Sequence, residues 1–527
     1  MVNASLPPEA LAQSQQPLLY VEGVHVQIGQ AIGAGSFGKA YRAFSPELDT
    51  SSMLAVKMQR LPDYPTTHRG ALHDPSTLLH APDIEDEAQE AQQVYESRER
   101  IMREFRLMKA LREHPGVARV LLADVVTGPD GSEWGAGVME YYEKGTLQGW
   151  IKRGGRDTIQ GIHFIKDVAS AVQYVHDNGF LHKDIKPENV LLSANGRAVL
   201  SDFGIAAPAD SRFWTKEDRM FSNFGTAEYA AQEQTNGKPT VYSDLYSLAA
   251  TAYCAFAGVP PFGNVNPVAQ ARAHRLHPVP SFEKWTGQAN TKLLNAVEPV
   301  IVKALSKREQ DRQLSVMAFA HELEDAAYEA IEPRAVARMA FPEAYSRKRS
   351  QEVTARAYDA AVAGQHDEAL ALYDEAISLD QINSKAHFQK AHILESLGRQ
   401  DDANASFVAA YSCPLKTPAD LVRRGAILAR FGRHEEALAY YADARKRGHT
   451  NAVSCTYEAE SMQAHAEVEL LRGRDERADA LYRGAQQLYE LASSEAAEDA
   501  VLDRISHKKE RLLGRIAAVQ AVAAAVI

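Results

Sequence analysis

One run of eight residues, His182 to Asn189, constrains this chain more than any other segment. It reads His-Lys-Asp-Ile-Lys-Pro-Glu-Asn, and Asp202-Phe203-Gly204 begins thirteen positions after its last residue. The run brings together a carboxylate, a lysine and an amide oxygen, and a second carboxylate follows after a predicted hairpin. Phosphoryl transfer needs this inventory, because its transition state spreads negative charge over the phosphoryl oxygens. A plain polar turn would not require so many ordered matches, so phosphoryl transfer is the favoured interpretation.

These residues resemble the catalytic segments of the eukaryotic-type (Hanks-type) serine/threonine protein kinases. The resemblance implies that Asp184 orients the substrate hydroxyl and that Lys186 contacts the transferring phosphate of ATP. It also implies that Asn189 and Asp202 hold Mg²⁺ or Mn²⁺. We therefore expect an α+β bilobal protein kinase fold that phosphorylates serine and threonine hydroxyls of proteins.

The nucleotide would bind upstream, at a G-x-G-x-x-G pattern formed by Gly33, Gly35 and Gly38. In a dinucleotide-binding turn a helix would open at the third glycine, but residues 40–44 and 54–58 alternate like two strands, so we expect a hairpin over the phosphates. The kinase resemblance implies further nucleotide contacts from Lys57 on the inner phosphates, from its helix partner Glu104, and from adenine-facing residues. The adenine-facing residues would be Ala40, Ala55, Met139, Glu140 and Tyr142. Glu99 is the alternative partner for Lys57.

Several positions depart from the usual kinase pattern. Lys183 replaces the customary arginine before the catalytic aspartate, and it lacks the planar fork that grips a phosphorylated activation loop. Gln232 replaces a proline, and Ala40 replaces a larger valine. These departures leave a second hypothesis open, in which a slow or inactive kinase fold serves as a scaffold. Thr226 is expected to hydrogen-bond near the catalytic aspartate.

An insertion, placed at residues 61–98, lengthens the connection from Lys57 to Glu104 to forty-six residues, far more than a strand-to-helix connection needs. Three histidines in it, at positions 68, 73 and 80, allow a metal hypothesis, but their spacing favours a solvated loop. The acidic run from Asp83 predicts an early start of the regulatory helix, which would then project beyond the small lobe.

A second periodicity occupies the C-terminal part of the chain. Gly364, Gly398 and Gly432 recur every thirty-four residues, and Gly473 follows forty-one residues later. Each glycine precedes an aromatic residue and an alanine: Tyr373 and Ala376, Phe407 and Ala410, Tyr441 and Ala444, Tyr482 and Ala485. The pattern resembles tetratricopeptide repeats, which implies an all-α superhelix that binds a peptide or protein on its concave surface. An unrelated helical bundle and a purely stabilising appendage are the alternatives.

Composition limits the partners and the compartment. A net charge of -11 argues against non-specific binding to nucleic acid, and three scattered cysteines form no disulfide pattern. The first sixteen residues lack a conventional secretory signal, so we expect a cytoplasmic protein, with a non-classical secretion route left open. The apolar stretch 245–262 approaches the length of a membrane span but fits a buried helix better, so we expect no membrane span. The expected organisation is a disordered tail (1–19), a kinase domain (20–331, small lobe to about 139 and large lobe from about 143), a linker (332–350), repeats (351–490) and capping helices (491–527).

Overall fold

The computed structural model describes residues 18–35, 38–48, 53–62, 85–128, 130–155, 157–214, 218, 225–263, 265–286, 292–496 and 499–526. The chain divides into two units, Met1–Glu309 and Gln310–Ile527. The tail predicted at 1–19 lies outside the described residues up to position 17, and a strand begins at Leu18.

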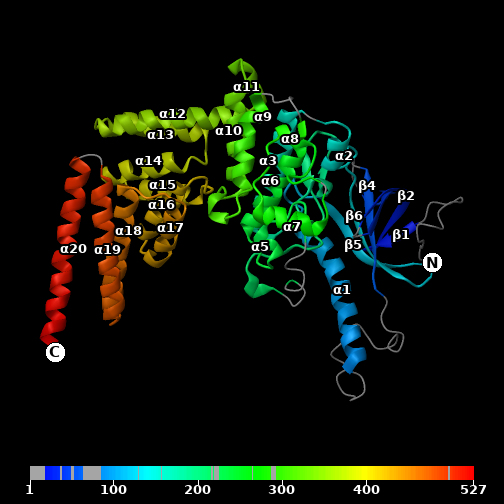
Figure 1. Ribbon diagram of the computed structural model, residues 1–527, viewed down its shortest axis with the longest axis horizontal. Coiled ribbons are helices and arrows are strands. Elements are labelled where there is room, and N and C mark those ends of the chain that lie inside the picture. The colour runs from blue at the N-terminus through cyan, green and yellow to red at the C-terminus, as the bar shows by residue number, and fades with distance from the viewer. Residues whose placement is uncertain are drawn as a thin grey trace. The chain divides into compact units, whose positions relative to one another are not determined.

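The first unit begins with an antiparallel six-stranded sheet in the order β1-β2-β3-β4-β6-β5 (Figure 1). Its strands are β1 Leu18–Val21, β2 Val24–Gly35, β3 Gly38–Phe44, β4 Leu54–Arg60, β5 Val120–Thr127 and β6 Glu133–Glu140. Buried valine, isoleucine and leucine side chains from these strands form one hydrophobic cluster, which suits a pleated surface covered on one face. The small lobe is thus a β-sheet, as the kinase resemblance implies.

Helix α1, Glu85–Ala110, packs on this sheet. Phe105 of α1 is fully buried and lies so close to β6 that a Cβ added at Gly137 would meet its ring at 2.4 Å. Helix α1 has 26 residues, which span about 39 Å at 1.5 Å per residue. The predicted early start of this helix is confirmed, so residues 85–98 of the insertion are helical. Residues 63–84, with the three histidines, lie outside the described residues.

The helices of the large lobe follow. They are α2 Leu147–Lys152, α3 Thr158–Asp177, α5 Gln232–Thr235, α6 Val241–Ala257, α7 Pro267–Leu276, α8 Glu283–Thr286 and α9 Lys292–Ala304, with short 3₁₀ turns at Pro187–Asn189, Ser211–Phe213 and Glu309–Asp311. Two small antiparallel ribbons pair β7 Phe180–Leu181 with β10 Ala207–Pro208 and β8 Val190–Leu192 with β9 Ala198–Leu200. The β8–β9 hairpin separates Asn189 from Asp202, as the sequence predicted.

Helix α6 contains most of the long apolar stretch. Every residue from Ser243 to Ala257 is buried. Burial of this helix in the core of the large lobe explains why the stretch is apolar. Among the described residues, no helix combines the length and apolar character that a membrane span requires.

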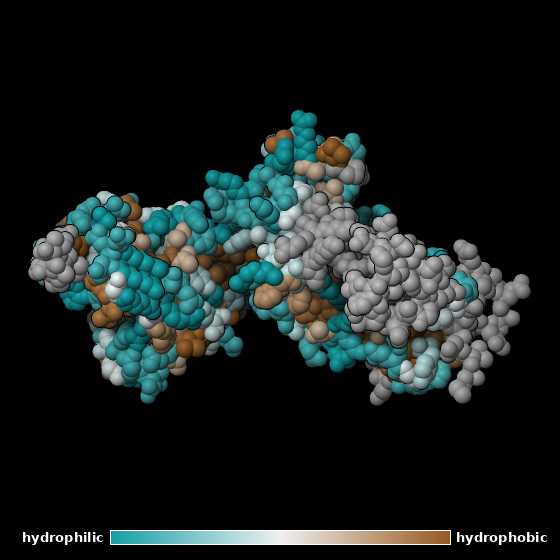
Figure 2. All heavy atoms as spheres, turned by 90° about the horizontal axis from the view of Figure 1, so that it is seen from below, coloured by the Kyte–Doolittle hydropathy of each residue, from teal (hydrophilic) through white to brown (hydrophobic). Residues whose placement is uncertain are grey.

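The second unit is entirely helical among its described residues. Its helices are α10 Val316–Ala330, α11 Arg334–Ala340, α12 Pro342–Val362, α13 His366–Leu379, α14 Ser384–Ser396, α15 Gln400–Ser412, α16 Pro418–Arg430, α17 His434–Lys446, α18 Ala452–Leu471, α19 Asp475–Glu495 and α20 Asp499–Val526. From α12 to α19 they form consecutive hairpin-like pairs (Figure 1). Seen from below in Figure 2, this unit mixes hydrophilic side chains with small hydrophobic patches.

The four recurring glycines stand at the turn inside each of these pairs. Gly364, Gly398, Gly432 and Gly473 have φ values of 78°, 75°, 78° and 70°. This left-handed backbone conformation ends a helix and favours glycine. The aromatic residue and the alanine that follow each glycine are all buried, none more than 4% exposed. The spacing read from the sequence therefore corresponds to one helix pair for each copy.

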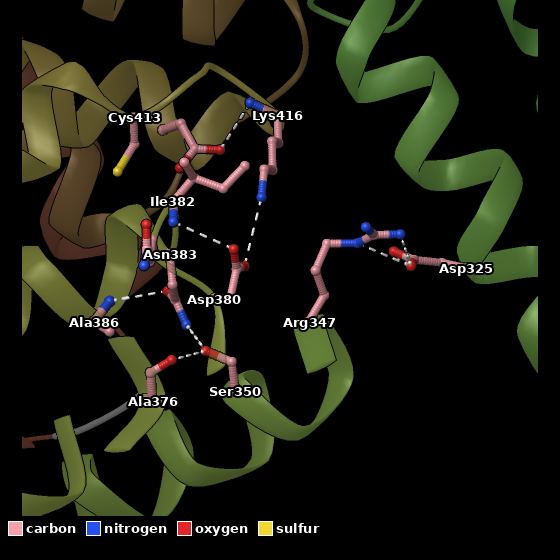
Figure 3. A network of polar contacts seen from close by, with 12 residues as sticks. Asp325, Arg347, Ser350, Ala376, Asp380, Ile382, Asn383, Ala386, Cys413 and Lys416 are labelled. Carbon is pink, nitrogen blue, oxygen red and sulfur yellow. Dashed lines mark hydrogen bonds and ion pairs between the residues drawn. The ribbon is translucent and has the colours of Figure 1, made fainter. Parts of the chain in front are cut away.

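Residues 332–350, predicted as a polar linker, are instead largely helical, and helix α10 belongs to the second unit. The basic run at 347–349 misled the prediction, because Arg347 is buried. Its guanidinium pairs with Asp325 at 2.7 Å (Figure 3) and with Glu324 at 3.0 Å. Arg347 thereby joins α12 to α10, so the second unit begins before the predicted boundary at 331.

A second polar network joins the first two helix pairs (Figure 3). Asn383, just before α14, donates to Ser350 Oγ at 2.8 Å and to Thr354 Oγ1 at 3.0 Å, and Ser350 donates to the Ala376 carbonyl at 2.6 Å. Asp380 forms an ion pair of 3.6 Å with Lys416. These bonds satisfy buried polar groups where the end of α13 meets α12.

Candidate active site

A buried ion pair connects the sheet of the small lobe to helix α1. Lys57 of β4 places its Nζ 2.7 Å from Glu104 Oε1 and 3.4 Å from Asp202 Oδ1. Burial alone would lower the pKa of Lys57, but the charges of Glu104 and Asp202 outweigh it and raise the pKa. The lysine is therefore a fixed cation. The alternative partner, Glu99, instead pairs with Arg106 on the same helix at 2.8 Å.

The carboxylate of Asp184 is held by groups on both of its oxygens. Lys186 Nζ lies 2.7 Å from Oδ2 and also donates to Thr226 Oγ1 at 2.7 Å. Thr226 Oγ1 in turn donates to Asp184 Oδ1 at 2.8 Å, which confirms the hydrogen bond expected of Thr226 beside this aspartate. The Asn189 amide donates to Oδ2 at 3.0 Å and to the Asp184 carbonyl at 2.9 Å. Because these bonds restrain its rotation, the carboxylate is oriented before any substrate arrives.

The loop that carries Asp184 depends on a carboxylate of α6. Asp244, fully buried, accepts bonds from the backbone N–H of His182 at 2.9 Å and of Lys183 at 2.8 Å, and from His176 Nε2 at 2.8 Å. Burial would raise the pKa of Asp244, but its bonds to His176 and the His182 backbone hold it below the ordinary value. Asp244 was not among the site residues predicted from the sequence. Its signal was a lone carboxylate in the first turn of an otherwise apolar helix.

Two non-glycine residues of the site have a left-handed backbone. Lys183 has φ 70° and Asp202 has φ 64°, which costs of order 1–3 kcal/mol at each position. Phe203, beside Asp202, packs its ring edge-on against His182 with the centroids 4.6 Å apart. Burial lowers the pKa of His182 and keeps its ring neutral. Surrounding packing therefore holds Asp202 in the orientation that also brings it to Lys57.

The glycine pattern forms the β2–β3 hairpin, with Gly33 opposite Ala40 and Gly35 opposite Gly38. Gly38 has φ 117°, and a Cβ there would lie 2.3 Å from the Met58 carbonyl oxygen, so only glycine fits. The dinucleotide-binding alternative is wrong, because a strand follows the third glycine. Residues 36 and 37, at the tip, lie outside the described residues.

The residues expected to face adenine lie along β4 and the end of β6. Ala55 pairs across the sheet with Met139, and both are buried. Glu140 is the last residue of β6. The Tyr142 carbonyl accepts from Gly145 at 3.1 Å, whereas its N–H donates to no backbone carbonyl of the described residues. Such an amide is available to a ligand.

Comparison with known proteins agrees with this geometry. The model of the protein kinase domain matches residues 84–323. The serine/threonine-protein kinase PknB of Mycobacterium leprae is 35% identical over 179 residues, which cover 33% of this chain and 28% of that protein. The serine/threonine-protein kinase PknK of Mycobacterium tuberculosis is 30% identical over 301 residues, 56% of this chain and 23% of that protein.

A probable serine/threonine-protein kinase PknB of Lactococcus lactis is 32% identical over 181 residues, 34% of this chain and 28% of that protein. The chain thus spans less than a third of the length of each of these relatives. The match to the protein kinase domain, at residues 84–323, includes the residues that hold Asp184 and the helix that carries Glu104. Residues 84–323 of the chain therefore match a protein kinase domain, and the relatives similar to this part of the chain are serine/threonine-protein kinases.

Proposed function

We propose that this chain is an active kinase that transfers the γ-phosphate of ATP to serine and threonine hydroxyls of proteins. The observation that carries the proposal is the simultaneous pairing of Lys57 with Glu104 and of Asp184 with Lys186 and Thr226. These two clusters come from segments far apart in the chain, yet each group has the partners that its role requires.

In this proposal Asp184 accepts or orients the proton of the substrate hydroxyl, and Lys186 stabilises charge on the transferring phosphoryl group. Lys57, held by Glu104, binds the inner phosphates, while the backbone of the β2–β3 hairpin covers them. Adenine would lie against Ala40, Ala55 and Met139, with hydrogen bonds to the backbone of Glu140 and Tyr142. Hydroxyl and phosphate would meet beside the oriented carboxylate of Asp184, as general-base catalysis requires.

Asn189 and Asp202 fit a divalent cation. The amide nitrogen of Asn189 makes both of its hydrogen bonds to Asp184, which leaves its oxygen for another ligand. An amide oxygen and a carboxylate are hard donors of the kind that Mg²⁺ or Mn²⁺ prefers. When bound, the metal would neutralise negative charge on the phosphates.

A phosphorylation assay tests the proposal. The purified full chain, given Mg²⁺, ATP and casein, should label casein or itself on serine or threonine, and Asp184→Ala and Asp202→Ala should abolish the label. Asp177→Asn, on the surface at the end of α3, is a matched control and should retain activity. A wild-type signal no higher than that of the two alanine variants would favour the scaffold hypothesis.

We propose in addition that α12–α19 are tetratricopeptide repeats that bind a protein partner and thereby recruit substrate or regulate the kinase. The support is the repeated turn glycine with its buried alanine and aromatic residue in each pair. Helices α16 and α17 also approach each other closely at a small residue, Gly425. A Cβ at this position would lie 2.7 Å from the Tyr441 ring. The net charge of -11 supports the proposal that the protein has no nucleic-acid partner. Its three free cysteines support the proposal that it is cytoplasmic.

A cavity of about 320 Å³ within the repeats is the proposed partner site. It is lined by aromatic and polar side chains of α14 to α18, among them Phe388, Phe407 and Tyr457. Three nitrogens on its wall are buried and have no hydrogen-bond partner among the described residues, namely Nε2 of His392, Nε of Arg430 and Nδ1 of His434. Buried polar atoms are normally satisfied, so a bound peptide that accepts from Arg430 and forms hydrogen bonds with the two ring nitrogens would complete this site.

Affinity capture tests this second part. The full chain with Asp184→Ala serves as bait, and Ala464→Phe fills the cavity from α18. Val408→Phe, exposed on α15, is the matched control. A specific protein captured by the bait and the control, but lost from the cavity-filled variant, would support partner binding. Equal capture by all three would argue against this cavity, and no specific capture would favour the appendage alternative.

A further inference from the structure

Asp218 is a buried carboxylate in the segment between Asp202 and Glu233, and it is 7% exposed. Arg103 of α1 donates from one guanidinium nitrogen to both of its oxygens, at 3.0 and 3.2 Å. Arg103 directly precedes Glu104, which pairs with Lys57. The contact joins residues 115 positions apart, so no local preference accounts for it.

Lys183 provides a second positive charge beside Asp218. Its side chain is 2% exposed, and it directly precedes Asp184. Burial lowers the pKa of Lys183 to about 8, while the charges of Asp218 and Asp244 oppose this shift and Arg103 adds to it. Asp218 is thus close enough to both cations to interact with each of them.

The carboxylate of Asp218 offsets the repulsion between two positively charged side chains. Arg103 and Lys183 repel each other, because the charge of Arg103 disfavours the protonated lysine. A buried charge is tolerated when it is paired, and removal of one partner leaves the others uncompensated. Without Asp218, the positive charges of Arg103 and Lys183 would repel each other with no carboxylate of Asp218 to offset them.

We propose that Asp218 is a positioning residue, whose carboxylate draws Arg103 and Lys183 together and so aligns Glu104 with Asp184. The inference rests on the proposed kinase function and adds to it a means of control. A phosphate opposite clustered cations commonly orders a kinase segment. Here the chain supplies the anion itself, so catalysis requires no phosphate on this segment. The lysine at position 183 suits a single carboxylate, since it does not offer the planar fork that matches a phosphate.

The test compares kcat and KM for ATP among phosphatase-treated full-length proteins. Asp218→Asn keeps the shape but removes the charge, and it should lower kcat/KM roughly tenfold or more. Asp218→Glu restores the charge and should recover most of this loss, which a purely steric role would not allow. Asp210→Asn is the matched control, because in the described part of the chain Asp210 pairs with the nearby, exposed Arg212. It should leave kcat/KM unchanged.

Arg103→Met attacks the same pair from helix α1 and remains informative if Asp218→Asn does not fold. Combined with Asp218→Asn, it should cost little more than either change alone, because both remove one interaction. Wild-type kcat/KM in Arg103→Met, or in a folded Asp218→Asn, would overturn the inference. So would loss of wild-type activity on phosphatase treatment. An untreated wild type without activity would instead refute the kinase function itself, and the inference with it.

Discussion

Asp244 of α6 is a fully buried carboxylate that accepts hydrogen bonds from the backbone of the catalytic loop, residues 182–189. Its replacement by asparagine measures how much these bonds stabilise the loop. Asparagine keeps the size of the side chain but converts one acceptor oxygen into an NH₂ group. That group would face donors, because Oδ2 accepts from His176 and His182 and Oδ1 accepts from Lys183. At least one buried N–H therefore loses its acceptor in either orientation of the amide.

The magnitude follows from these contacts. Breaking a buried charged network from one side costs about 3–5 kcal/mol. For a unit of this size, 1 kcal/mol shifts the melting temperature by roughly 2–4 °C, so Asp244→Asn should lower it by roughly 6–20 °C. Activity should fall as well, since the backbone of His182 and Lys183 leads directly into Asp184.

Differential scanning calorimetry of the full chain measures the change in the transition of the first unit. Asp177→Asn, an exposed carboxylate that accepts from Gln173, is the control and should change stability by no more than about 0.5 kcal/mol. A shift for Asp244→Asn as small as that of the control would refute the reasoning. The dependence on pH gives a second check. A carboxylate with a depressed pKa in the folded state stabilises the protein above its unfolded pKa, so this contribution should persist at neutral pH and disappear only below the ordinary value of 3.8.

Three further changes test other parts of the molecule. Gly137→Ala should raise the KM for ATP and cost about 1–3 kcal/mol, because the new Cβ displaces Phe105 beside Glu104; Gly514→Ala, with nothing within 4 Å, is its calorimetric control. Lys183→Arg should extend kcat/KM above pH 8, where the wild-type lysine, depressed to about 8 by burial, loses its charge beside Asp218; identical pH profiles would contradict this. Arg347→Leu should destabilise the second unit by about 3–5 kcal/mol, because the buried carboxylate of Glu324 loses the positive charge of Arg347, and an unchanged calorimetric transition of that unit would show that α10 is not anchored there.

Loss of the proton from Lys183 should change folding stability and activity in opposite directions. A lysine whose folded pKa lies below its unfolded value of 10.5 binds fewer protons when folded, so between about pH 8 and 10.5 the folding stability rises with pH. Activity should move in the opposite direction over this range, because the charge that Asp218 binds disappears. A parallel loss of stability and activity would point to general unfolding instead.

Local sequence patterns were enough to predict the chemistry and the division into a kinase-like part and a repeat-like part. Phosphoryl transfer was predicted from the order and spacing of residues 182–189 and 202–204, and the helix pairs were predicted from glycines that recur after thirty-four, thirty-four and forty-one residues. Both are local patterns, readable because backbone conformation and side-chain inventory repeat along the chain. The early start of α1 could be predicted for the same reason, from acidic residues that complement a helix N-terminus.

The pairing of charged groups could not be predicted from the sequence and became clear from the three-dimensional arrangement. Glu104 rather than Glu99 pairs with Lys57, Asp244 supports the catalytic loop from 61 and 62 positions away, and Asp218 reaches Arg103 across 115 positions. The boundary between the units moved for the same reason, since Arg347 is buried against α10 although its basic run is typical of a solvated linker. Such ion pairs depend on burial and on contacts between distant segments, and neither is written into local sequence.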